Sequence, residues 1–196
     1  ELFERQRRRL GIDTLFYYDE ALVFPEGNEL PQGNREEMVS AAQVMYREMS
    51  PETGEFFDFM VEHELFDLET KPNKRMGGYC TFLPKYKAPF IFSNFNGTSA
   101  DADVLTHEAG HAFEAYTASR RQTLSAYIHS TSEINEIHSM SMEHFAYPWM
   151  DRFFRNADKY RYAHLFGALN VIPYMICVDE FQHRVFEDPT QGPTQW

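Results

Sequence analysis

The chain has 196 residues, 43% of them hydrophobic, which is enough to build one core and excludes a disordered protein. Its formal net charge of -12, with no basic run longer than Arg7-Arg8-Arg9, argues against a nucleic-acid surface and against binding to an anionic membrane. No stretch approaches the roughly 20 apolar residues of a membrane helix, and Cys80 and Cys177 form no Cys-x-x-Cys pair, so they are interpreted as small buried residues of a cytoplasmic protein.

The first half of the chain is predicted to be a lead-in followed by helices. Residues 1–33 form the lead-in, charged and helix-prone at its start and then irregular, because Pro25, Gly27 and Asn28 interrupt any period. Residues 34–76 are predicted to be helical. The cap signals and apolar spacing indicate two helices, one after Asn34 to about Met49 and one after Ser50, with Pro51 in its first position, to about Leu68.

The second half begins with the one predicted β-hairpin, residues 77–95. Its strands are the aromatic and β-branched runs Tyr79–Leu83 and Pro89–Phe92. Residues 101–189 then return to helical spacing. The predicted helices cover 101–119, 134–147 and 159–186, the last with a kink at Pro173.

The helix predicted over 101–119 contains a His-Glu-x-x-His motif, which runs from His107 to His111. Residues four apart lie on one face of a helix, so the two imidazoles can bind one metal ion at roughly 2.0–2.1 Å. Glu108 points about 100° away from His107, where it can reach a water on the metal. This spacing is typical of a zinc hydrolase in which Glu108 is the general base.

A catalytic zinc usually has a third protein ligand. One class of zinc protease would place Gly and His at positions 114 and 117, where this sequence has Glu114 and Thr117, so that class is excluded. A second class takes a Glu from a following helix. Helical geometry does not choose among the candidates, because positions three and seven apart share a face. These candidates are Glu133, Glu136 and Glu143.

The motif and its surroundings resemble the thimet oligopeptidase and oligoendopeptidase F family of zinc peptidases, and are most like bacterial oligoendopeptidases. The likeness is strongest from Gly77 to Pro189. The resemblance implies that Glu136 is the third zinc ligand and that Glu143 matches a second acidic residue of the family. The role of Glu143 stays open between a hydrogen bond to a zinc-bound imidazole and a solvated helix face. The flanking segments that carry the likeness are 79–84, 93–97 and 178–183.

The resemblance further implies a mainly α, zincin-like catalytic core with a small β-hairpin or sheet edge, in which residues 1–196 are part of a larger peptidase. It implies a zinc-dependent endopeptidase that hydrolyses short peptides, with Zn²⁺ bound by His107, His111 and Glu136 and with Glu108 as base. The family places the His and Tyr groups that bind the polarised carbonyl on a segment after Trp196. We therefore expect this chain alone to be weakly active.

Two other classes of function compete with this interpretation. One is a non-catalytic zinc-binding scaffold, against which Glu108 speaks, because a structural zinc has no use for a base. The other is a zinc hydrolase that acts on a non-peptide bond. The sequence is silent on cleavage preference and on oligomeric state.

Overall fold

The computed structural model describes residues 1–195, which form two compact units. One unit is Glu29–Ala157, and the other combines Glu1–Asn28 with the segment that begins at Asp158. Helices dominate and the single sheet has three strands, so the predicted mainly α fold class with a small β element is confirmed.

The unit that contains both chain ends consists mainly of two helices, α1 (Leu2–Leu10) and α6 (Ala157–Glu187). Arg9 connects them, because its guanidinium lies over the rings of Tyr162 and Phe166 at 4.9 and 5.2 Å. The helix α6 is assigned as one helix with Pro173 in its interior.

The prediction that both cysteines are buried is wrong for Cys177 on α6, which is exposed, whereas Cys80 is partly buried. Apolar neighbours of Cys177 are exposed as well, Tyr174 by 70% and Ile176 by 60%, so the described residues leave this stretch of α6 uncovered. The usual burial of free cysteines therefore did not predict the exposure of Cys177.

The larger unit begins with the two predicted helices, α2 (Arg35–Met49) and α3 (Pro51–Glu62). Both predicted caps are present. The Asn34 side chain accepts from the Glu37 backbone N–H at 3.0 Å, and Ser50 Oγ accepts from that of Thr53 at 3.1 Å. Such bonds satisfy backbone donors that a helix start otherwise leaves free.

The predicted end of α3 near Leu68 is wrong. The helix stops at Glu62, Glu64 takes a left-handed backbone conformation at φ 51°, and Phe66–Glu69 forms a strand, β1. Strand β1 pairs in parallel with the later strand β3. The run from Phe66 to Glu69 alternates apolar and acidic residues, and pairing with a distant strand selected the two-residue period over the helical one.

The predicted hairpin is confirmed as the antiparallel pair β2 (Tyr79–Leu83) and β3 (Ala88–Phe95). The strand order is β1-β3-β2, so β2 lies at an edge of the sheet. Lys74 holds the loop before β2. Its ammonium donates to the carbonyl oxygens of Asp67, Glu69 and Ser93 at 2.6–2.9 Å, which ties this loop to both other strands.

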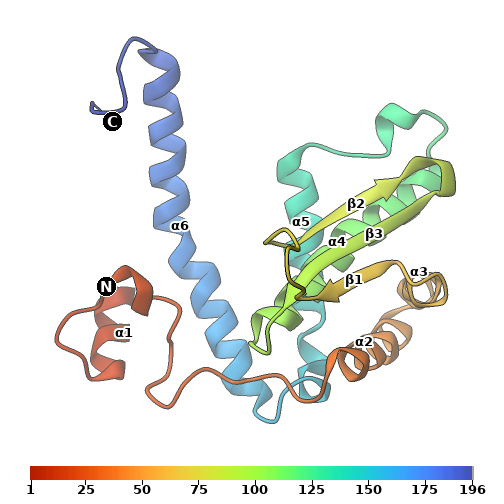
Figure 1. Cartoon of the computed structure of the whole chain (residues 1–196), viewed down its shortest axis with the longest axis horizontal. Coiled ribbons are helices and arrows are strands. Elements are labelled where there is room, and N and C mark those ends of the chain that lie inside the picture. Colours follow the sequence, from red (N-terminus) through yellow and green to blue (C-terminus); the bar gives the residue numbers. More distant parts are fainter. Residues whose placement is uncertain (196) are drawn as a thin grey trace. The chain divides into compact units, whose positions relative to one another are not determined.

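Helix α4 (Ala100–Arg121) packs along the sheet and α5 (Ser132–Phe145) packs on α4, as Figure 1 shows. Asp101 fixes the start of α4, because its buried carboxylate accepts from the backbone N–H groups of Asn96 and Gly97 at 2.9 and 2.8 Å. The core lies between α2, α3, the sheet and α4. Its fully buried large side chains include Tyr46, Phe56, Phe57, Met60, Leu68, Ile91 and Leu105.

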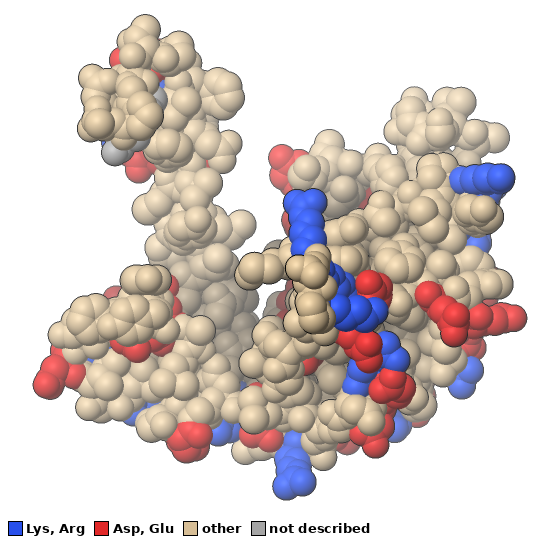
Figure 2. Space-filling model, viewed as in Figure 1, with Lys and Arg blue, Asp and Glu red and all other residues tan. Residues whose placement is uncertain are grey.

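The described residues also form short 3-10 helices, at Tyr17–Asp19, Pro84–Tyr86, Ser125–Tyr127 and Tyr147–Arg152. Acidic and basic side chains are intermingled on the face that Figure 2 shows. Within residues 1–195, none of the helices combines the length and the apolar character that crossing a membrane requires.

Candidate metal centre

Helix α4 presents both histidines of the motif on one face. The His107 and His111 rings lie with centroids 4.9 Å apart and planes at 81° to each other. Each side chain is partly buried, with 26% and 20% of its surface exposed. The spacing of four residues therefore places the two imidazoles as the sequence predicts.

Helix α5 brings Glu136 to this pair. Its Oε2 atom lies 3.2 Å from Nε2 of His107 and 3.6 Å from Nε2 of His111. One potential ligand atom from each of the three residues lies within 4.8 Å of the others, and this is the one such group found among the described residues. Two helices thus supply three donors that converge on one point.

The donor set fits zinc. Two ligands that bind Zn²⁺ at 2.0–2.1 Å in tetrahedral directions lie about 3.3 Å apart, and the separations of 3.2 and 3.6 Å bracket that value. Two imidazoles and one carboxylate are also a ligand combination of catalytic zinc sites, which leave a fourth position open.

The three acidic candidates on α5 occupy different places. Glu136 faces both imidazoles, whereas Glu143 Oε1 lies 2.5 Å from Nδ1 of His107, on the other side of that ring. Glu133 is exposed in the first turn of α5. The contact of Glu143 has the geometry of a carboxylate that orients a metal-ligating His, the first of the two roles that the sequence left open.

The surroundings change the pKa of each imidazole. Burial disfavours the charged form of His107, but the hydrogen bond with Glu143 and the nearby negative charges of Glu143, Glu108 and Glu136 outweigh it, so the pKa of His107 is raised. Burial and the adjacent charge of His107 lower the pKa of His111, which favours the neutral, metal-binding form of that ring.

Glu108 lies on the same helix and is almost fully buried, with 8% of its surface exposed. Burial raises its pKa above the ordinary value, and this outweighs the lowering by the charge of His107 and by a hydrogen bond from the backbone N–H of Cys80. A buried carboxylate with a raised pKa beside two imidazoles is suited to accept and return a proton near neutral pH.

A cavity of about 260 Å³ lies beside two of the three potential ligand residues and the edge strand β2. His111 and Glu136 line one part of it, and Cys80, Thr81 and Phe82 of β2 line another. A peptide placed along β2 would therefore pass beside the metal-ligand candidates.

Reasoning from the sequence did not identify two contributors to the site. The backbone N–H of Cys80 bonds Glu108 through pairing that depends on the fold. The Ser139 hydroxyl donates to Glu136 Oε2 at 2.8 Å, three residues along the helix. His129 packs edge to face against Phe82, with ring centroids 5.9 Å apart, and also lines the cavity.

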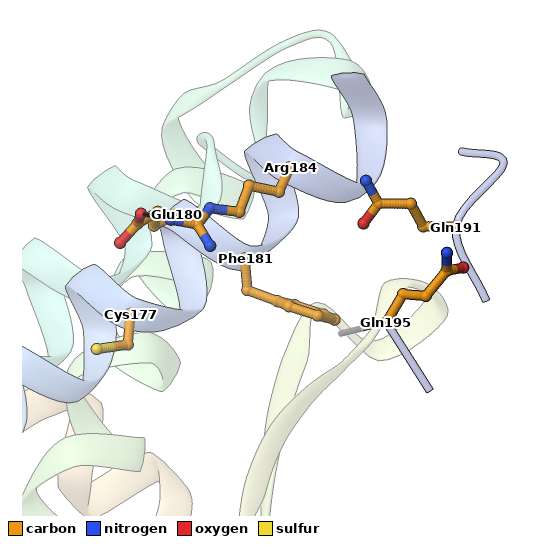
Figure 3. A pocket seen from close by; sticks show the side chains of 6 residues that line it. All are labelled: Cys177, Glu180, Phe181, Arg184, Gln191 and Gln195. Atoms are coloured by element: carbon orange, nitrogen blue, oxygen red, sulfur yellow. Dashed lines mark hydrogen bonds and ion pairs between the residues drawn. The ribbon is translucent and has the colours of Figure 1, made fainter. Parts of the chain in front are cut away.

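A second cavity, of about 170 Å³, belongs to the unit that contains the chain ends. Figure 3 shows its lining, with Cys177, Glu180, Phe181 and Arg184 on α6 and two glutamines from the segment after it. Arg184 forms an ion pair with Glu180, so the two charged groups of this lining neutralise each other. Among the described residues, this lining holds no metal-ligand set comparable to the centre on α4 and α5.

Helices α4 and α5, the small sheet and the His-Glu-x-x-His motif have the arrangement of a zincin-like metallopeptidase catalytic core. The model of peptidase family M3 matches residues 43–195, and the chain belongs to this family. The resemblance to the thimet oligopeptidase and oligoendopeptidase F family is thereby confirmed. A comparison with curated proteins found no match.

Solved structures agree with this assignment. A protein provisionally assigned as oligoendopeptidase F is 57% identical over 99% of this chain, with a TM-score of 0.94. PZ peptidase A in complex with an inhibitor is 57% identical over 93%, with a TM-score of 0.89. A Bacillus anthracis protein with the same provisional assignment is 53% identical over 99%, with a TM-score of 0.93. The chain spans about a third of their lengths, 34%, 32% and 36% respectively.

Proposed function

We propose that the protein is a zinc-dependent endopeptidase that hydrolyses short peptides. The observation that carries this proposal is the convergence of Glu136 Oε2 on the Nε2 atoms of His107 and His111, with Glu108 buried beside them. Membership of a peptidase family supports the reaction class. The name oligoendopeptidase F, borne by two of the relatives, supports short peptides as the substrate class.

Zinc bound by His107, His111 and Glu136 would polarise the scissile carbonyl and lower the pKa of a water molecule towards 7. The carboxylate of Glu108 accepts a proton from that water molecule while the water oxygen attacks the carbonyl carbon. Glu108 then donates the proton to the leaving amine nitrogen as the C–N bond breaks. The peptide is cleaved without a covalent intermediate on the protein.

Other residues hold these groups in place. Glu143 accepts from Nδ1 of His107, which leaves Nε2 directed towards Glu136. The backbone N–H of Cys80 holds the Glu108 carboxylate next to β2, where substrate would lie. The proton acceptor is therefore attached both to the ligand helix and to the edge of the sheet.

The proposal is tested by zinc analysis of the intact protein together with hydrolysis of a panel of internally quenched peptides, esters and small amides. We expect about one zinc per chain and turnover confined to peptides, abolished by a chelator and restored by zinc. Turnover of esters with no peptide cleavage would favour a hydrolase of non-peptide bonds. Zinc without turnover of any substrate would favour a binding scaffold.

We further predict that a peptide substrate pairs with the exposed edge of β2, over residues 77–83. The motivation is the position of β2 at the end of the sheet and the cavity that it shares with His111 and Glu136. Main-chain pairing with an edge strand recognises backbone independently of side chains, so cleavage should tolerate many sequences.

N-methylation of single substrate amides tests this pairing. Because every second residue of a strand directs its N–H to one neighbour, we expect kcat/KM to fall up to about tenfold at alternate positions, with the intervening positions as internal controls. A uniform profile, or a peptide-bound structure without main-chain hydrogen bonds to residues 77–83, would show the prediction to be wrong.

A further inference from the structure

Helices α4 and α5 approach each other most tightly at Gly110, inside the His-Glu-x-x-His motif. A Cβ atom added to Gly110 would lie 2.6 Å from Cα of Ser139, 2.8 Å from the carbonyl oxygen of His138 and 3.1 Å from Cβ of Met142. Ordinary contacts of a Cβ begin at 3.4 Å, and the two nearest atoms belong to the α5 backbone. Side-chain rotation does not relieve such a clash, so α5 itself would have to move.

This contact lies at the level of the metal centre. Gly110 directly precedes His111, and Ser139 follows Glu136 by less than one helical turn. A displacement of α5 away from α4 would therefore carry Glu136 away from both imidazoles. It would also separate Glu143 from His107, because Glu143 lies one turn further along α5.

Ser139 has a second connection to the same ligand. Its side chain is fully buried, and its hydroxyl lies 2.8 Å from Oε2 and 3.1 Å from the backbone oxygen of Glu136. Oε2 is the oxygen that faces both histidines. Because 53% of the Glu136 side chain is exposed, packing restricts its rotamer only in part, and the hydrogen bond from the Ser139 hydroxyl restricts it further.

We propose that Gly110 and Ser139 are positioning residues for the third metal ligand, an inference that rests on the proposed metal-binding function. Gly110 sets the separation of the two helices, and Ser139 sets the direction of the Glu136 carboxylate. Neither residue belongs to the proposed ligand set of His107, His111 and Glu136. Glycine is a poor residue for a helix interior, and the close approach of α5 gives a physical reason for its presence between the two histidines.

The test compares Gly110→Ala and Ser139→Ala in the intact protein with two matched controls. Gly167→Ala adds the same methyl group to another helical glycine, where no atom beyond the neighbouring residues and the backbone of its own helix lies within 4 Å. Ser141→Ala removes a hydroxyl from the same helix two residues further on. The readouts are the Kd for zinc, from competition with a chromophoric chelator, and the visible absorption of the Co²⁺-substituted protein, with circular dichroism to follow folding.

We expect Ser139→Ala to weaken zinc binding about 10- to 100-fold, as loss of a group that orients a ligand does, and Gly110→Ala to weaken it at least as much. Both should alter the intensity of the Co²⁺ absorption, which reports coordination, while both controls match the unchanged protein. If Gly110→Ala fails to fold, Ser139→Ala decides, because it adds no atom.

Unchanged zinc affinity and Co²⁺ absorption in Ser139→Ala would overturn the inference. Glu136→Ala, measured in parallel, separates this failure from failure of the proposed function. If Glu136→Ala loses zinc while the positioning variants bind it normally, the inference alone is wrong. If Glu136→Ala keeps its zinc, the assignment of Glu136 as a ligand is wrong, and the inference about Gly110 and Ser139 is then wrong as well.

Discussion

Replacement of Glu108 by Gln is expected to lower kcat for peptide hydrolysis by about 10² to 10⁴-fold, the contribution typical of a general base, while zinc content stays unchanged. The amide has the shape of the carboxylate and can still accept the hydrogen bond from the backbone N–H of Cys80. It does not accept the proton of the attacking water. The three proposed ligands are untouched, so the loss should appear in kcat rather than in metal content.

Zinc stoichiometry and single-turnover hydrolysis of a quenched peptide, measured on the same samples, test this expectation. Glu133→Gln is the matched control, because it makes the same chemical change at an exposed position in the first turn of α5. Near-normal hydrolysis by Glu108→Gln would mean that another group is the base.

Replacement of His111 by Ala is expected to remove both zinc and turnover. His111 supplies one of three converging donors, with its Nε2 atom 3.6 Å from Glu136 Oε2. Loss of a group that only orients a ligand costs 10- to 100-fold in metal affinity, so we expect loss of a ligand to cost more than about 100-fold. Turnover should fall in proportion to zinc occupancy and recover in part at high zinc concentration.

Competition with a chelator measures the affinity, and peptide hydrolysis across a zinc titration measures the recovery. His63→Ala is the control, because His63 lies at the end of α3, where its ring packs against Phe59 at 4.6 Å. Full zinc content in His111→Ala would remove His111 from the ligand set. The contrast with Glu108→Gln, which keeps its metal, distinguishes a ligand from a base.

Local sequence features predicted much of the fold. The caps at Asn34 and Ser50 depend on bonds to residues three positions away, so α2 and α3 begin where the sequence places them. The prediction failed at Phe66–Glu69, where the apolar pattern suits a helix and a strand alike. Its partner β3 lies more than twenty residues later, and no local signal reports that pairing.

The candidate site, like the fold, could be predicted from the sequence only in part. The four-residue spacing of His107 and His111 follows from helix geometry alone, and so does the direction of Glu108 relative to them. The identity of the third donor does not follow from helix geometry. Glu133, Glu136 and Glu143 repeat on one face of α5, and the choice of Glu136 in the sequence rested on resemblance to a family.

Tertiary packing gives that choice its physical basis. The close contact of Gly110 with the backbone of α5 at Ser139 sets the distance between α4 and α5. At this distance Glu136 reaches both imidazoles, and Glu143 reaches Nδ1 of His107. The sequence therefore contains the two histidines and the base as one local unit, because a single helix holds all three. The proposed third ligand reaches the two histidines only when two helices pack, because the distance between helices depends on which side chains, or which missing Cβ, lie between them.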